Sequence, residues 1–299
     1  MNTKSGFVTI VGKPNVGKST LTNKLVGENI SIVTDKPQTT RKRVLGILDK
    51  EDYQIVFLDT PGILEPKYLL QEKLIEYVES SVKDADILVF MIAAKDLAKE
   101  TKIFDKENFK KIISNKRQKK ILVINKMDLS DSQTINNAIT IFEQNELFEK
   151  VIPISALENF NLDTLLNTIL EYLPVHPKFY PDDQLTDEPE KFFVAEKIRE
   201  KILDIFHDEI PYSVEVFIEQ FIERERGKDY ISAVIVVERE SQKPIILGKK
   251  GASIKKLGNA ARKSVEEFLM REIYLELRVK VVENWRKDKN ALKNFGYTN

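Results

Sequence analysis

The segment from Gly12 to Ser19 constrains the fold of this chain more than any other feature. It fits the pattern Gly-x-x-x-x-Gly-Lys-Ser/Thr, between an apolar run at residues 7–11 and a helical pattern at 20–25. In such a loop, backbone N–H groups converge on phosphate oxygens, and the helix N-terminus adds its positive end. We expect Lys18 to neutralise the β- and γ-phosphates and Ser19 to bind Mg²⁺. The expected nucleotide-binding loop comprises Gly12, Lys13, Pro14, Asn15, Val16, Gly17, Lys18, Ser19 and Thr20.

Short apolar runs alternate with helical patterns from residue 7 to about residue 173. This alternation is typical of an α/β domain with a mostly parallel sheet. The runs at 44–48 and 53–58 are joined by four polar residues and predict a hairpin, which leaves one antiparallel strand at the edge. The other expected strands are at 7–11, 87–93, 121–124 and 151–154. We therefore expect residues 1–174 to form a domain with a mixed six-stranded sheet and helices on both faces.

An acidic, proline-bearing stretch at 175–190 is interpreted as a linker. Residues 191–299 then predict a smaller α+β domain with a charged tail. Its expected elements are a helix at 191–209, strands at 212–221 and 230–237, a helix at 252–270 and a strand at 273–282.

Composition excludes several classes of chemistry. The 299 residues include no cysteine and two histidines, so disulfides, thiol catalysis and cysteine-ligated metals are excluded. Basic and acidic residues both number 47, so the net charge predicts no partner. Between residues 239 and 263, however, eight basic residues stand against one acid, which indicates a polyanion-binding face. Neither a signal segment nor a membrane-length apolar run is visible, so we expect a cytoplasmic protein.

The tetrapeptide Asn125-Lys126-Met127-Asp128 follows the expected strand at 121–124 and predicts a guanine site. A carboxylate at Asp128 can accept hydrogen bonds from the N1–H and exocyclic amine of guanine, which adenine lacks. Asn125 would support the loop and the base edge, and the stem of Lys126 would cover the ring. The tripeptide after the next strand would offer a backbone N–H to the guanine O6 atom. It consists of Ser155, Ala156 and Leu157.

The tetrapeptide Asp59-Thr60-Pro61-Gly62 ends the expected strand at 53–58, at the same sheet edge as the phosphate loop. There Asp59 can hold Mg²⁺ through water, and the Gly62 N–H can reach a γ-phosphate. Thr39 or Thr40, in the loop before the second strand, could complete the Mg²⁺ shell. Each segment taken singly is also an ordinary turn, but their shared order and placement argue against coincidence.

With these motifs in this order, the chain resembles the translation-factor-related GTPases, and within them the Era, TrmE and EngA branch. The resemblance implies GTP and GDP as ligands. It also implies an Mg²⁺ ion held by Ser19, Thr40 and Asp59, because it favours Thr40, the residue before Arg41, over Thr39.

The resemblance further implies hydrolysis of GTP supported by Lys18, Thr40 and Gly62. Where many signalling GTPases carry a water-orienting Gln after Gly62, this chain has Ile63, so a polar side chain is excluded there. Asn15 stands where potassium-activated relatives hold a monovalent cation. K⁺ binding and a simple loop hydrogen bond both stay open for this residue.

The segment Gly248-Lys249-Lys250-Gly251 lies in the basic stretch, after an apolar approach at 245–247. Two glycines let the backbone approach a sugar–phosphate chain, lysines add charge, and an apolar groove can receive unstacked bases. The segment resembles the Gly-x-x-Gly loop of KH domains, here of type II. The expected RNA-binding residues are Ile246, Gly248, Lys249, Lys250, Gly251, Lys255 and Arg262, with Ile245 and Ile254 beside the groove.

A phosphate-loop GTPase domain followed by a KH domain resembles the Era family over nearly the whole chain. The family implies a GTPase that binds single-stranded small-subunit ribosomal RNA near its 3′ end and assists small-subunit assembly as a nucleotide-controlled switch. TrmE-like proteins end in a cysteine-containing motif and EngA-like proteins carry two GTPase domains, and this chain has neither. An RNA-binding module with a purely structural nucleotide site is the alternative. We expect a monomer, and a peripheral contact with the inner face of the cell membrane stays open.

Overall fold

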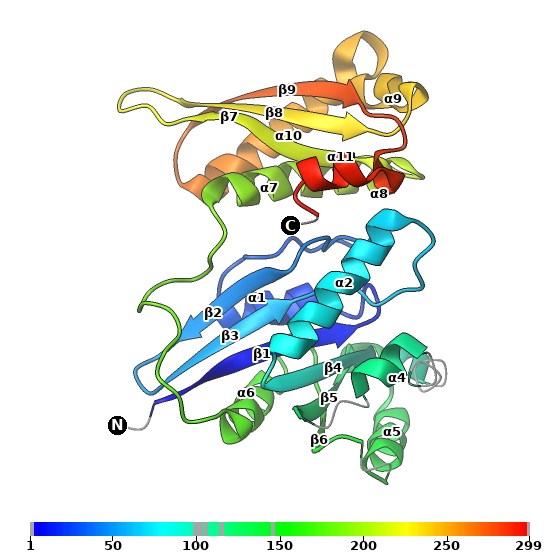
Figure 1. Cartoon of the computed structure of the whole chain (residues 1–299), viewed down its shortest axis with the longest axis vertical. Helices are drawn as coiled ribbons and strands as arrows, with labels where there is room; N and C mark the ends of the chain where they lie inside the picture. The colour runs from blue at the N-terminus through cyan, green and yellow to red at the C-terminus, as the bar shows by residue number, and fades with distance from the viewer. Residues whose placement is uncertain (1–2, 98–103, 105–106, 114–116, 145–146, 298–299) are drawn as a thin grey trace. The chain divides into compact units, whose positions relative to one another are not determined.

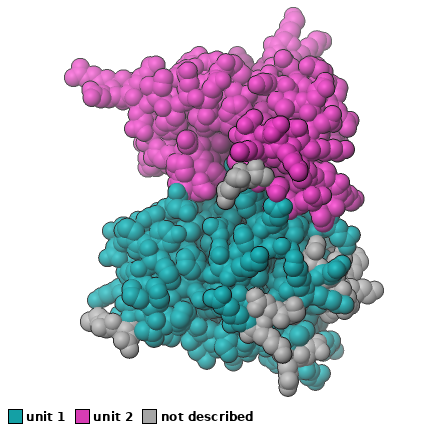
Figure 2. Space-filling view, in the orientation of Figure 1, with its two compact units in different colours: residues 1–31, 40–65, 74–187 teal, residues 32–39, 66–73, 188–299 magenta. Residues whose placement is uncertain are grey.

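The computed structural model describes residues 3–97, 104, 107–113, 117–144 and 147–297. The chain divides into two compact units (Figure 2), of which the first comprises residues 1–31, 40–65 and 74–187. The second comprises residues 32–39, 66–73 and 188–299. Two short segments from the N-terminal part of the sequence therefore group with the C-terminal residues.

A six-stranded mixed sheet forms the centre of the first unit (Figure 1), with the strand order β2-β3-β1-β4-β5-β6. β2 is antiparallel to β3, and the other neighbours are parallel. The strands are β1 (Lys4–Gly12), β2 (Val44–Asp49), β3 (Tyr53–Asp59), β4 (Ile87–Ala93), β5 (Lys119–Asn125) and β6 (Lys150–Pro153). The predicted sheet, with its antiparallel hairpin at one edge, is confirmed.

Helices cover both faces of this sheet (Figure 1). On one face, Phe90 and Leu122 belong to a core that includes Val78 of α2, Phe109 of α4 and Phe142 of α5. On the other face lies α1, which follows the phosphate loop and contacts β1, β2 and β3. The helices are α1 (Lys18–Val26), α2 (Leu69–Asp84), α4 (Glu107–Ile113), α5 (Ser132–Gln144) and α6 (Leu162–Tyr172).

The stretch expected as a linker at 175–190 is packed over most of its length. Its main chain runs beside the hairpin of the first unit, where Ile47 donates to the carbonyl oxygen of Leu185 at 2.8 Å. The buried Gln54 side chain donates to the Tyr180 carbonyl oxygen at 2.9 Å. Residues up to 187 therefore belong to the first unit, and the next helix begins at Glu190.

The second unit contains a three-stranded sheet in the order β7-β8-β9. β7 (Glu215–Ile222) is antiparallel to β8 (Asp229–Val237), and β9 (Ile273–Val281) is parallel to β8. Helices α7 (Glu190–Ile205) and α10 (Ala252–Leu269) pack against each other and share one core with the sheet. This is the predicted small α+β domain. Among the described residues, no helix is long and apolar enough to cross a bilayer.

Several expected boundaries in the second unit are wrong. The helix expected at 191–209 ends at Ile205, and α8 (Ile210–Ser213) replaces the start of the strand expected at 212. Pro211 lies in the first turn of α8, where its missing N–H is tolerated, and β7 begins only at Glu215. The apolar approach at 245–247 belongs to the short helix α9 (Lys243–Leu247).

The charged tail of the chain folds back onto the second unit. Trp285 is fully buried, and its indole N–H donates to the carbonyl oxygen of Ser213 at 2.9 Å. The helix α11 (Lys289–Asn294) follows, with the Asp288 carboxylate accepting from the Ala291 N–H at its N-terminus. Beyond the helix, the side chain of Tyr297 is buried as well.

We expect Gly46→Ala to destabilise the protein by about 1–3 kcal/mol, the usual range for overpacking a core. A Cβ at Gly46 in β2 would lie 2.1 Å from Ile30 Cδ1 and 2.9 Å from Val26 Cγ2. In the control Gly258→Ala, a Cβ would meet Leu277 Cδ1 at an ordinary 3.7 Å, and removing a helix-interior glycine should stabilise by about 0.5–1 kcal/mol. Urea unfolding followed by circular dichroism measures both, and an unchanged Gly46→Ala midpoint would contradict this packing.

Candidate nucleotide and RNA sites

The phosphate loop joins β1 to α1 with a backbone that requires glycine at position 17. Gly17 has φ of 101°, and a Cβ there would lie 2.4 Å from Asn125 Nδ2. The buried Lys18 ammonium donates to the carbonyl oxygens of Lys13 at 2.9 Å and Gly12 at 3.3 Å. The loop is thus curled around the ammonium group that would meet the phosphates.

Lys18 carries a charge that its surroundings do not fully stabilise. Burial lowers the pKa of its ammonium to about 8, although the nearby Asp59 carboxylate opposes this shift. A bound phosphate adds negative charge beside the ammonium and therefore raises its pKa again. The positive charge of Lys18 is therefore most stable when an anionic ligand occupies the loop.

The side-chain amide of Asn125 joins three predicted motifs. Its Nδ2 donates to the carbonyl oxygen of Val16 at 2.8 Å, and its Oδ1 accepts from the N–H of Ala156 at 2.9 Å. The neighbouring Lys126 ammonium donates to the carbonyl oxygen of Asn15 at 2.7 Å. The Asn125 amide is buried, so its two bonds are shielded from water, whereas the Lys126 bond is exposed. The loops after β1, β5 and β6 therefore form one connected site.

The carboxylate expected to recognise guanine is exposed but held in place. One oxygen of Asp128 accepts from the hydroxyl of the buried Ser155 at 2.7 Å. Leu157 is also exposed, whereas Ala156 uses its N–H to brace Asn125. The structure thus places the Asp128 carboxylate next to the loop 155–157, and both were predicted to bind guanine.

Ser19, Thr40 and Asp59 provide an oxygen-rich site that fits Mg²⁺. The hydroxyl oxygens of Ser19 and Thr40 are 2.9 Å apart. Adjacent ligands of an octahedral Mg²⁺ with bonds of 2.0–2.1 Å are also about 2.9 Å apart. Both carboxylate oxygens of Asp59 are buried without a hydrogen-bond partner among the described residues. Burial raises the pKa of Asp59, with the Lys18 charge in opposition, so a cation beside it is favourable.

The structure separates the two threonines that the sequence left as alternatives. The Thr39 hydroxyl bonds to the Thr34 hydroxyl at 2.7 Å and to the Lys36 carbonyl oxygen at 2.6 Å. Of the two threonines, Thr40 is the one whose hydroxyl lies within hydrogen-bond distance of the Ser19 hydroxyl. The contact geometry thus favours Thr40.

The turn after β3 lies directly against the phosphate loop. A Cβ at Gly62 would be 2.5 Å from Pro14 N, so the position excludes any side chain. The N–H of the next residue, Ile63, donates to the Gly12 carbonyl oxygen at 2.9 Å. The Ile63 side chain is buried in the core and cannot orient a water molecule.

The predicted RNA loop connects α9 to α10. Gly248 has φ of 71°, and a Cβ there would lie 2.2 Å from Ser253 Oγ. Gly251 has φ of 78° with open space around it, so only its backbone conformation favours glycine. The side chains of Lys249 and Lys250 between them are exposed. The loop presents backbone and positive charge to solvent.

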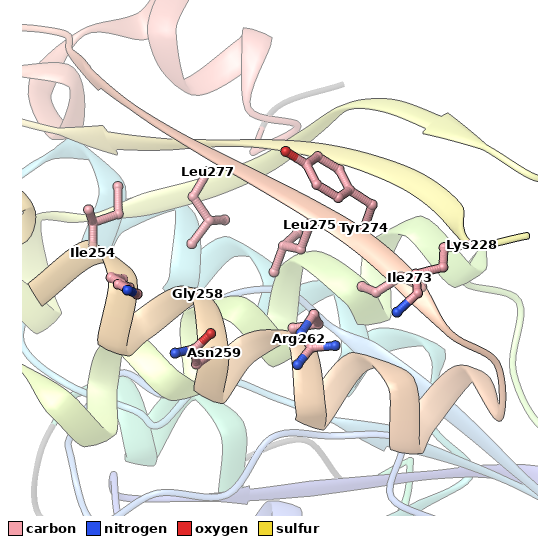
Figure 3. Close-up of a pocket in the computed structure, with 10 residues that line it drawn as sticks. Lys228, Ile254, Gly258, Asn259, Arg262, Ile273, Tyr274, Leu275 and Leu277 are labelled. Carbon is pink, nitrogen blue, oxygen red and sulfur yellow. The ribbon is translucent and has the colours of Figure 1, made fainter. Parts of the chain in front are cut away.

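A groove of about 560 Å³ lies between α10 and β9 (Figure 3). Ile254, Gly258 and Arg262 are spaced at i, i+4 and i+8 and line the helix side. Leu275 and Leu277 project from β9 toward the helix, whereas the exposed Tyr274 ring points to the other side of the strand. The remaining lining residues are Lys228, Lys255, Asn259 and Ile273. The groove is therefore apolar inside, with cationic side chains around it.

One expected RNA contact is wrong. The Ile246 side chain is fully buried in the core of the second unit, because α9 turns this residue inward. Its neighbour Ile245 is 47% exposed. Asn259, Leu275 and Leu277 also line the groove and were not predicted from the sequence, although the strand alternation at 275–277 was a usable signal.

Two family models match this chain. The model described as "50S ribosome-binding GTPase" matches residues 7–126. The model described as "KH domain" matches residues 209–286. The two matches cover the nucleotide motifs up to Lys126 and the complete Gly-x-x-Gly loop.

Full-length relatives share both parts. GTPase Era of Geotalea daltonii is 45% identical over 98% of this chain and 97% of its own length. A crystal structure of an Aquifex aeolicus Era variant bound to GDP and AlF4⁻ has a TM-score of 0.92 at 40% identity, and covers 99% of this chain and 100% of that one. A crystal structure of Era with MgGDPNP and nucleotides 1506–1542 of 16S ribosomal RNA has a TM-score of 0.91, with the same identity and coverage. This chain belongs to the Era family of GTPases.

Proposed function

We propose that this GTPase uses its KH domain to bind single-stranded RNA near the 3′ end of 16S ribosomal RNA, and that it assists small-subunit assembly. The observation that carries the proposal is the exposed Gly-x-x-Gly loop beside an apolar groove with basic side chains, in a chain with a connected guanine nucleotide site. The Era structure with MgGDPNP and nucleotides 1506–1542 of 16S ribosomal RNA supports it.

Hydrolysis of GTP depends on positioning and charge in this site. Lys18 would neutralise phosphate charge, the hydroxyls of Ser19 and Thr40 with Asp59 would hold Mg²⁺, and the Gly62 N–H would donate to the γ-phosphate. Mg²⁺, when bound, would offset negative charge on the phosphate oxygens. No Gln follows Gly62, so water is oriented by backbone groups and intrinsic turnover should be slow.

RNA binding follows from the shape and charge of the groove. Lys249 and Lys250 contact the sugar–phosphate backbone as it passes the loop. The apolar surface of Leu275 and Leu277 receives unstacked bases, which only single-stranded RNA can offer. Asn259 and Arg262 supply hydrogen-bonding groups at the base edges.

Guanine selectivity should shift when Asp128 is replaced by Asn. The amide can donate to the second carbonyl of xanthine but cannot accept from guanine, so GTP affinity should fall at least tenfold and XTP affinity should rise. Nucleotide competition titrations measure the ratio. Asp131→Asn is the control, because it removes the same charge from a carboxylate that bonds to Thr134 at the start of α5. A GTP preference retained in Asp128→Asn would contradict the assignment.

Potassium should accelerate hydrolysis relative to sodium. We propose that Asn15, exposed in the phosphate loop with φ of 63°, helps to hold a K⁺ ion whose charge offsets that developing between the β- and γ-phosphates. Turnover in matched KCl and NaCl should differ by at least tenfold, and Asn15→Ala should remove the difference. Equal turnover in the two salts would leave Asn15 with a loop hydrogen bond only.

Neutralising the loop lysines should weaken RNA binding and reduce its salt dependence. For Lys249→Gln/Lys250→Gln, we expect the slope of log K against log salt to fall by about 1.4, at 0.7 for each lost phosphate contact on a single strand. GTP binding should not change. Lys289→Gln/Lys293→Gln is the control, because it removes two exposed charges from α11. If the two pairs reduce the slope equally, the loop is not the phosphate contact.

A further inference from the structure

A fully buried arginine in α7 has no role in the sites described so far. The Nε atom of Arg199 donates to Glu196 at 2.8 Å, and its Nη2 donates to Glu196 and to the carbonyl oxygen of Thr39. Its Nη1 has no hydrogen-bond partner among the described residues. A buried guanidinium is stable only when charges and acceptors surround it, so the Thr39 carbonyl is part of what satisfies Arg199.

Two acidic residues stabilise the charge on Arg199. Burial alone would lower its pKa, but Glu196 and Glu215 outweigh burial and raise it. Glu215 is itself buried and accepts a hydrogen bond of 2.5 Å from the hydroxyl of Tyr297, near the end of the chain. The cation is therefore permanent, and its surroundings include the folded tail.

Other contacts within the second unit hold the segment 32–39, which contains Thr39. Lys36 donates to the carbonyl oxygens of Leu203 and Phe206 at the C-terminal end of α7, where a cation is favoured. The Tyr68 hydroxyl donates to the Gln38 side chain at 3.2 Å.

The Thr34–Thr39 and Thr39–Lys36 hydrogen bonds close the loop on itself. The Thr39 carbonyl is the last group anchored to α7 before Thr40. A shift at this carbonyl would pass directly to the next residue through the peptide plane.

We propose that Arg199 is a positioning residue for GTP hydrolysis, which holds the Thr39 carbonyl and thereby sets the place of the Thr40 hydroxyl. The proposal rests on the proposed role of Thr40 as an Mg²⁺ ligand. Thr40 lies one peptide bond from the anchored carbonyl, and its hydroxyl is 2.9 Å from that of Ser19. Arg199 bonds to Glu196 and to the Thr39 carbonyl oxygen, and in this proposal it acts on the metal site through Thr40.

Arg199→Lys tests this role because it keeps the buried charge but loses the planar fork that serves Glu196 and Thr39 together. We expect kcat for GTP hydrolysis to fall roughly 10- to 100-fold, as for a displaced catalytic group, and the Mg²⁺ concentration for half-maximal rate to rise. GDP affinity without Mg²⁺ should be unchanged. Lys201→Met on the same helix is the control, because Lys201 pairs with Glu200 and Asp204 of α7.

A double-variant comparison separates positioning from general stability. If Arg199 acts through Thr40, Arg199→Lys should add no further loss to Thr40→Ala, whereas multiplied losses would overturn the proposal. Normal hydrolysis and Mg²⁺ requirement in Thr40→Ala would overturn the metal role of Thr40 itself. An impaired Thr40→Ala beside a normal Arg199→Lys would overturn the positioning role alone.

Amide hydrogen exchange provides a readout without catalysis. The amides of residues 34–36 and 38–40 should exchange faster in Arg199→Lys than in the parent protein, and unchanged exchange would overturn the proposal. If Arg199→Lys fails to fold, Glu196→Gln replaces it. This substitution turns one of the two carboxylate oxygens that accept from Arg199 into an NH₂ donor, and the Glu196 side chain is partly exposed, so the fold should tolerate the change. In Glu196→Gln we expect a smaller fall in kcat, a smaller rise in the Mg²⁺ requirement and a smaller increase in amide exchange. The absence of these changes would contradict the proposal.

Discussion

The side-chain amide of Asn125 donates to the Val16 carbonyl oxygen and accepts from the Ala156 N–H, and the nucleotide site depends on these two bonds. Val16 lies in the phosphate loop, Asn125 ends β5 and Ala156 follows β6, so one amide spans three loops. A buried donor or acceptor left unpaired costs about 1–3 kcal/mol. The amide therefore makes the positions of the phosphate loop and the base-recognition loops interdependent.

The second unit contains both the segment 32–39 and the predicted RNA groove. Helix α7 anchors the segment 32–39 through Arg199, and α10 lines the RNA groove, while the two helices pack against each other. Arg286 anchors the segment 66–73, because its guanidinium group lies over the Tyr68 ring, 4.8 Å from the ring centroid. If Thr40 and the groove have the roles proposed for them, RNA bound along α10 and the nucleotide would be coupled through the segment 32–39 and this core. Linkage requires such an influence on binding to be equal in both directions.

The sequence predicted most of the nucleotide site because each motif is local and the topology is regular. Parallel strands end at one edge of the sheet, so motifs at strand ends meet there once the strands are identified. The same reasoning identified the Gly-x-x-Gly loop. It could not choose between Thr39 and Thr40 from the residues alone, because that choice depends on which hydroxyl lies against Ser19.

What the sequence did not reveal, or predicted wrongly, depends on how the chain folds rather than on its residue pattern. Arg199 looks like an exposed residue of a charged helix, although it lies beside the buried Ile198 and Ile202, and its partners come from elsewhere in the chain. Ile246 differs from Ile245 only through the turn of α9, a helix too short to show periodicity. The acidic stretch at 175–190 had a linker composition, but its backbone pairs with the hairpin edge.

Hydrogen exchange of the phosphate-loop amides in the nucleotide-free protein tests the bracing role of Asn125 most directly. Asn125→Asp keeps the size of the side chain and the acceptor for Ala156, but it places a carboxylate oxygen against the Val16 carbonyl. We predict faster exchange at residue 13 and residues 15–18 in Asn125→Asp. Asp128→Asn changes the same site without altering the Asn125 hydrogen bonds and should show parent-like exchange. Equal exchange in the two variants and the parent would contradict the account, because the loop would then hold its shape without Asn125.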